Sequence, residues 1–103
     1  MKLQIIKRKY PKAFQTFIAK RKDIIYLSAD VRGYWKEITD FMDKQEIFIT
    51  IEKPCVGFNF YVWDELSEKH ESDNDYLFRD KAETLAIKKA FQILEERLQE
   101  GGK

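Results

Sequence analysis

Between about residues 46 and 63, apolar and polar positions alternate with a period of two, which is typical of β-strands. A short segment containing Pro54 and Gly57 separates two such runs, so we predict an antiparallel hairpin over 46–63. One side of this hairpin is apolar along its length. Its residues are Ile47, Ile49, Ile51, Phe58, Phe60 and Val62.

Elsewhere the apolar residues recur at helical spacing. The helices are expected at about 11–21, 31–44 and 80–99. Pro11 suits the first position of its helix, where a backbone N–H would have no partner. A third strand is predicted near 24–27 or 76–78. The segment around Leu3 and Ile6 fits either a short helical turn or a strand, and the pattern does not decide between them.

These elements predict a single α+β domain over residues 1–103, a length that supports one hydrophobic core. A lone hairpin is barely stable in water, so helices must cover its apolar side. The hairpin residues expected to pack against the C-terminal helix are Ile49, Ile51, Phe58 and Phe60. Glu95 and Glu96 of that helix are expected to face solvent. The junction at Lys44–Gln45–Glu46 lacks the glycine expected of such a turn.

The opposite side of the hairpin carries Phe48, Tyr61 and Trp63. Soluble monomers rarely leave a large apolar patch in water, so this side needs a cover. Either the helix at 31–44 or the helix at 11–20 covers it, giving three layers. Alternatively it is a contact surface, most simply that of a two-fold homodimer.

Cysteine usage and hydropathy bear on the location of the protein. Cys55 is the only cysteine, so no intrachain disulfide forms, as is typical of a reducing compartment. No apolar run approaches the roughly 20 residues that span a bilayer, and the first residues lack a signal-peptide pattern. We therefore expect a cytoplasmic protein with no membrane partner.

Charge is distributed unevenly, although the net charge is only +1. Residues 1–36 hold ten Lys or Arg and two Asp, whereas residues 37–103 hold nine bases and sixteen acids. Such a basic segment can bind nucleic-acid phosphates; alternatively its charges face solvent or pair within the fold. The candidate phosphate contacts form two clusters, Lys7, Arg8, Lys9 and Lys12, and Lys20, Arg21 and Lys22.

The run Gly57–Trp63 is similar to the aromatic strand of RNA-recognition motifs and cold-shock domains, where aromatic side chains stack on bases. It departs from that pattern at two positions. Val56 stands where a basic residue is expected, and Asn59 replaces a small residue. A tight turn also joins the two strands where the RNA-recognition fold needs a helix and a strand. These departures favour ordinary core packing.

Few side chains suit catalysis or metal binding. Cys55 and His70 could pair as nucleophile and base, but no orienting third group or oxyanion device accompanies them. His70 lies among acidic residues, but the run 73–75 lacks the glycine and distal glutamate of a calcium loop. No GxSxG, HExxH, CxxC or phosphate-binding glycine loop is present. We predict no catalytic residue, no cofactor and no metal site.

Three stretches together resemble small uncharacterised proteins encoded by phages and integrated elements of Bacteroides-like bacteria. These stretches are Lys9–Phe14, Phe41–Ile49 and Phe78–Glu83 with the following Ala86–Glu95. The C-terminal half also resembles phage "ABA sandwich" proteins, which implies strands lying between helices. The shared motifs are capping and packing patterns, so the resemblance implies no catalytic residue.

Two functions remain from these observations. The first is a small accessory protein of a phage or mobile element that performs no chemistry and binds another protein or itself. The second is a nucleic-acid-binding accessory protein that uses the basic N-terminal third. An enzyme is not expected, because the chain lacks the motifs for one.

Overall fold

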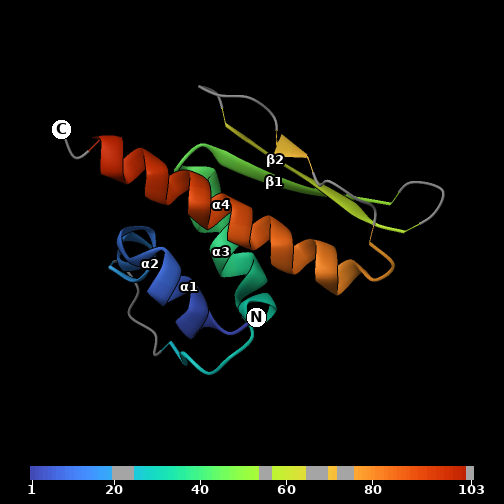
Figure 1. The fold of residues 1–103 in the computed structure, drawn as a ribbon, viewed down its shortest axis with the longest axis horizontal. Helices are drawn as coiled ribbons and strands as arrows, with labels where there is room; N and C mark the ends of the chain where they lie inside the picture. The colour runs from blue at the N-terminus through green and yellow to red at the C-terminus, as the bar shows by residue number, and fades with distance from the viewer. Residues whose placement is uncertain (20–24, 54–56, 65–69, 72–75, 102–103) are drawn as a thin grey trace.

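The alternating segment forms the predicted hairpin (Figure 1). Strand β1, Ile47–Glu52, pairs antiparallel with strand β2, Asn59–Asp64, one residue opposite one residue along their whole length. A two-residue strand, β3, His70–Glu71, pairs with β2, so the sheet order is β1-β2-β3. The structure is a computed structural model, and the residues it describes are 1–19, 25–53, 57–64, 70–71 and 76–101.

Helices occupy the segments with helical spacing, and the fold is α+β as expected. They are α1 (Leu3–Lys9), α2 (Pro11–Ile18), the 3₁₀ helix η1 (Val31–Tyr34), α3 (Trp35–Lys44) and α4 (Arg79–Gly101). Leu3 and Ile6 therefore belong to a helix, and both are buried. The helix predicted from residue 31 begins as a 3₁₀ turn, where the Asp30 carboxylate accepts the Arg32 N–H at 2.9 Å.

The junction between α3 and β1 shows how the chain turns without a glycine. Glu46 has a φ of 61°, in the left-handed region that glycine adopts most readily. Its N–H donates to the Asp43 carbonyl at 3.0 Å, one of several bonds that satisfy the carbonyls at the end of α3. A non-glycine residue therefore occupies the position where glycine was expected.

The third strand, β3, lies at neither of the two segments predicted for it, 24–27 and 76–78. Among the described residues, the segment 25–27 forms no strand, because its region serves as the cap of α1. The Leu3 N–H donates to the Ala29 carbonyl at 2.9 Å, and the Gln4 N–H donates to the Leu27 carbonyl at 3.0 Å. These N–H groups lie in the first turn of α1, where no partner exists within the helix.

The segment 76–78 also forms no strand of its own. Tyr76 makes a single bridge with Phe58, in which each N–H donates to the other residue's carbonyl, at 2.6 and 2.7 Å. This bridge fastens the start of β2 to the approach of α4. The acidic segment 64–77 also contains the end of β2 and the short β3.

Helix α4 is the centre of the fold. It contacts β1 and β2 on one side and α2 on another, so it lies between the hairpin and the α1–α2 pair (Figure 1). Its row of small residues, Ala82, Ala86 and Ala90, is fully buried and permits close approach of its neighbours. Phe17 of α2 makes edge-to-face contacts with Phe91 of α4 and with Phe41 of α3.

The hairpin side that contacts α4 is the predicted one. We call it the inner sheet face; Ile47, Phe60 and Val62 are buried there. Three further residues of this face, Ile49, Ile51 and Phe58, are partly buried and pack against the same core. The packing of the hairpin against the C-terminal helix thus agrees with the expectation from alternation.

The opposite side, which we call the outer sheet face, has no helical cover among the described residues. Phe48, Tyr61 and Trp63 do not join the hydrophobic core, and Trp63 is 40% exposed. The expectation that the helix at 31–44 or at 11–20 covers this face is wrong, because the buried residues of α3 and α2 belong to the same core as the inner-face residues of the hairpin. The described helices therefore lie on one side of the sheet, and the layer order differs from the helix–sheet–helix arrangement that the resemblance implies.

Candidate functional site

The outer sheet face presents an aromatic pair. Phe48 of β1 lies directly opposite Trp63 of β2, and their ring centroids are 4.7 Å apart with an interplanar angle of 38°. Cross-strand aromatic pairs stabilise a hairpin, each by roughly 0.2–1 kcal/mol. Trp63 nevertheless remains 40% exposed, whereas Phe48 is partly buried.

The charge of the outer sheet face bears on the class of molecule that the face can bind. Within the described strands β1 and β2, the face carries no Lys or Arg, and Glu52 is its charged residue. Base-stacking proteins combine aromatic side chains with cations for the phosphates. The outer sheet face lacks those cations within β1 and β2.

No protein-family model matches the chain, and no curated protein or solved structure is significantly similar to it.

The basic residues lie away from the outer sheet face. Lys7, Arg8 and Lys9 occupy the last turn of α1, and Lys12 follows in α2; all four are exposed. None of them forms an ion pair with another described residue. Figure 1 places the α1–α2 pair on the far side of α4 from the sheet. The second basic cluster, Lys20, Arg21 and Lys22, lies outside the described residues.

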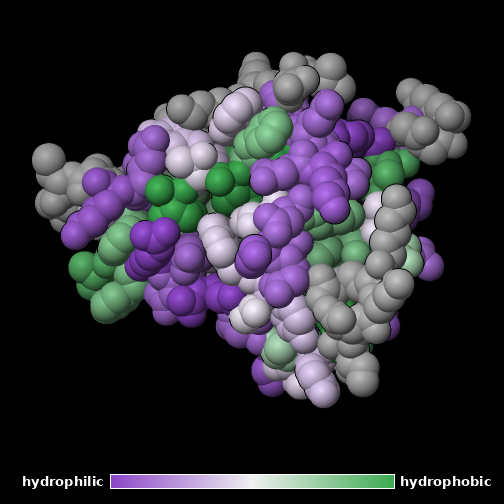
Figure 2. Space-filling view, turned by 180° about the vertical axis from the view of Figure 1, so that it is seen from behind, coloured by the Kyte–Doolittle hydropathy of each residue, from purple (hydrophilic) through white to green (hydrophobic). Residues whose placement is uncertain are grey.

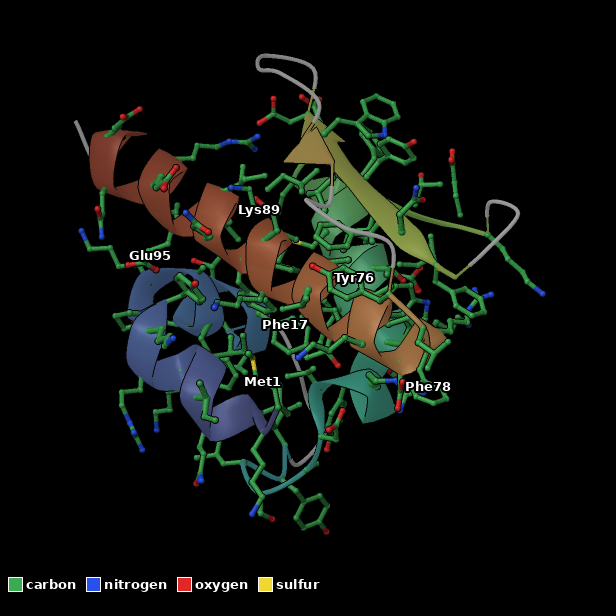
Figure 3. All side chains as sticks on the ribbon, turned by 45° about the vertical axis from the view of Figure 1, so that its right-hand side comes forward. Met1, Phe17, Tyr76, Phe78, Lys89 and Glu95 are labelled. Carbon is green, nitrogen blue, oxygen red and sulfur yellow. The ribbon has the colours of Figure 1, made fainter. Side chains whose placement is uncertain are left out.

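Glu95 is buried, which corrects the expectation that it faces solvent. Its side chain points from α4 toward the first helices (Figure 3), and its Oε1 accepts the Ala13 N–H at 2.8 Å. That N–H lies in the first turn of α2, which has no side-chain cap of its own. A carboxylate at a helix N-terminus is favoured by the helix dipole, so Glu95 acts as a cap supplied by another helix.

A second acid missed from the sequence is Asp64. It ends β2 on the inner sheet face and is only 7% exposed. Arg97 of α4 donates to its Oδ2 at 2.6 Å, and donates also to the Gln45 carbonyl at 2.5 Å. This arginine therefore ties the last turns of α4 to both the end of β2 and the turn before β1.

Two pKa shifts occur near the N-terminal helices. Burial raises the pKa of Tyr10, and the neighbouring charge of Glu96 raises it further. Partial burial alone would raise the pKa of Asp30, but hydrogen bonds from the Arg32 backbone and the N-terminal ammonium outweigh it and lower that pKa. Asp30 is thus held ionised, 3.1 Å from the amine of Met1. Both arrangements stabilise local structure and place no proton at a reactive position.

The residues weighed for catalysis and metal binding remain predictions. Cys55 lies outside the described residues, and for His70 the structure gives the strand position alone. Among the described residues, no group of three or more His, Cys, Asp and Glu side chains is placed to hold a metal ion. No helix in the described part of the chain is long and apolar enough to cross a membrane.

A hollow of about 490 Å³ lies between α2 and α3. Its floor includes Phe17 and Phe41, and its rim includes Glu37, Asp40 and Lys44. The lining also includes Thr16, whose hydroxyl donates to the Lys12 carbonyl at 2.9 Å. Seen from behind, the molecule shows hydrophobic residues as separate green areas among hydrophilic ones, without one continuous apolar surface (Figure 2).

Proposed function

We propose that the chain is a small, non-enzymatic protein-interaction module that binds a partner protein through the outer sheet face. The observation that supports this is the Phe48–Trp63 pair, in which Trp63 is exposed and Phe48 partly buried, on a face that no described helix covers. Aromatic residues are enriched at protein interfaces, and a few of them supply most of the binding energy. Tyr61 lies on the same face and extends the proposed contact surface.

The charge pattern supports a neutral, apolar patch on the partner. Within β1 and β2, Glu52 is the charged residue of the outer sheet face, so these two strands offer little attraction to a highly charged surface. The resemblance to small phage-encoded proteins supports an accessory role in a phage or mobile element. We place that role in the cytoplasm, on the basis of cysteine usage.

The test compares two lysine variants. Trp63→Lys places a charge in the centre of the proposed contact, whereas Tyr26→Lys changes another exposed aromatic residue, 63% exposed, away from the sheet. A protein captured from extract of the source cells is purified, and its affinity for each variant is measured by calorimetry. We expect Trp63→Lys to weaken binding roughly 30-fold or more, as loss of an interface hot spot does. Equal binding by both variants would refute the proposal.

A second candidate is nucleic-acid binding by the α1–α2 surface. The observation in its favour is that Lys7, Arg8, Lys9 and Lys12 are exposed and form no ion pair with another described residue. Cations on one surface bind phosphates by releasing counterions, so the affinity falls as salt rises.

Retention on immobilised single-stranded and double-stranded DNA tests this candidate. If the surface binds phosphates, retention falls with salt, and Arg8→Gln lowers the slope of log affinity against log salt by about one. Lys36→Gln, an exposed cation on α3, is the matched control and leaves that slope unchanged. Absence of retention at 50 mM salt, roughly the low end where such binding is strong, rejects the candidate.

A further inference from the structure

Strand β1 is an edge of the sheet. In the described part of the chain, β2 is the strand that pairs with it, and its other edge pairs with no strand. An edge strand presents backbone N–H and C=O groups that can bond to another extended segment. Ile47, at the start of β1, is buried, whereas the residues from Phe48 to Glu52 are partly buried or exposed. The strand beyond its first residue is therefore in contact with solvent.

This edge lacks the features that usually prevent pairing. Natural edge strands carry lysines, prolines or bulges, or they are very short. Strand β1 has six residues in unbroken one-to-one register with β2, so it contains no bulge. It also contains no Pro, Lys or Arg, and Glu52 is its one charge. The strand is thus built in a form that accepts another strand.

The chemistry of β1 makes a second copy a suitable partner. In an antiparallel pair centred on Thr50, each Ile49 lies opposite the other copy's Ile51, so the inner faces meet as isoleucine against isoleucine. The two Thr50 side chains lie opposite each other, and such Thr–Thr pairs are favourable. Glu52 lies opposite Phe48, so no like charges face each other within the paired residues. In this pairing, apolar side chains on the inner face therefore lie opposite apolar side chains, and no charge lies opposite a like charge.

We propose that two copies of this chain associate through their β1 edges, antiparallel and centred on Thr50, to form one continuous six-stranded sheet. A two-fold axis then passes beside Thr50, as expected for an interface in which one surface meets itself. Ile49 and Ile51, only partly buried in one copy, gain neighbours across the axis. The proposal goes beyond the proposed function, because the outer sheet face stays open for a different partner.

Sedimentation equilibrium from micromolar to several hundred micromolar protein is the first test. We expect a dimer for the unaltered chain. Thr50→Lys places two lysines directly opposite each other and should raise the dimer dissociation constant at least tenfold, while this exposed position keeps the fold intact by circular dichroism. Trp63→Lys, on β2, should change that constant less than threefold.

Three outcomes overturn the edge proposal: a monomer at every concentration, a Thr50→Lys variant as dimeric as the unaltered chain, or dissociation by Trp63→Lys and not by Thr50→Lys. The last would instead identify the outer sheet face as the self-association surface. If the dimer depends on Thr50 but Trp63→Lys does not weaken the binding of a partner protein, the proposed function is rejected and the edge dimer is supported.

A disulfide tests the register directly. In a Cys55→Ser background, Thr50→Cys brings two cysteines together across the axis, with Cα atoms within the roughly 4.4–6.8 Å that a disulfide needs. We expect mild oxidation to yield a covalent dimer. Glu52→Cys is the control. Position 52 is also exposed, but it lies opposite Phe48 of the other copy and about four residues along the strand from position 52 of that copy. Cross-linking of the control as readily as of Thr50→Cys overturns the proposed register.

Discussion

Replacing Phe60 with alanine is expected to lower the free energy of unfolding by roughly 3–5 kcal/mol. Phe60 lies on the inner sheet face, is only 7% exposed and belongs to the core that α4 closes. Its removal takes away buried apolar surface and leaves a cavity that a rigid helix–sheet contact fills poorly. Urea denaturation followed by circular dichroism measures the change as a lower midpoint at an unchanged slope.

Trp63→Ala is the matched control for Phe60. Both residues lie on β2, but Trp63 is on the outer sheet face and does not join the core. We expect this variant to lose about 1 kcal/mol, the magnitude of one cross-strand aromatic pair. Equal losses for the two variants would contradict the assignment of inner and outer sheet faces.

Replacing Arg97 with methionine is expected to cost about 2–3 kcal/mol of unfolding free energy. The guanidinium bonds both the Asp64 carboxylate and the Gln45 carbonyl, and Asp64 is almost fully buried. Breaking a buried pair by removing one partner costs more than the pair contributes, because the remaining charge stays away from water. The side chain of Arg97 is 32% exposed, so the loss falls below the roughly 3–5 kcal/mol seen for fully buried pairs.

A double-mutant cycle distinguishes this charge effect from loss of packing. Asp64→Asn removes the carboxylate charge with little change of shape. We expect Arg97→Met to cost at least 1 kcal/mol less in the Asp64→Asn background than in the unaltered chain, since coupled residues differ from additivity by roughly 0.5–3 kcal/mol. Additive losses would mean that Arg97 acts only through its aliphatic stem and the Gln45 carbonyl.

The sequence predicts the elements of this fold well because the hydrophobic period reports local geometry. The switch to a period of two marks the hairpin, and the long apolar surface over 80–99 marks α4. The same pattern does not show how the helices and the sheet are layered. Alternation shows that a strand has two faces, but which face receives a helix depends on packing between distant segments, and this is why the outer sheet face was assigned a cover.

Glu95 and Asp64 were missed for a related reason. Both are acids, and charged residues are almost never fully buried unless they are paired. Their partners are distant in sequence: Ala13 and Glu95 are separated by 82 positions, and Asp64 and Arg97 by 33. One signal was present, since α2 opens with Tyr10 and Pro11, neither of which supplies a side-chain cap, so its N–H groups needed an acceptor from elsewhere.

The central position of α4 has a consequence for the order in which the chain folds. This helix follows the other described elements in sequence, yet it contacts α2, η1, β1 and β2. Contacts between distant segments require large loops to close, which slows folding. On the ribosome, the hairpin and the N-terminal helices emerge before the helix that buries their apolar sides. A nascent chain therefore keeps its isoleucine-rich strand exposed until synthesis has passed α4, which is the period when a chaperone would have most to bind.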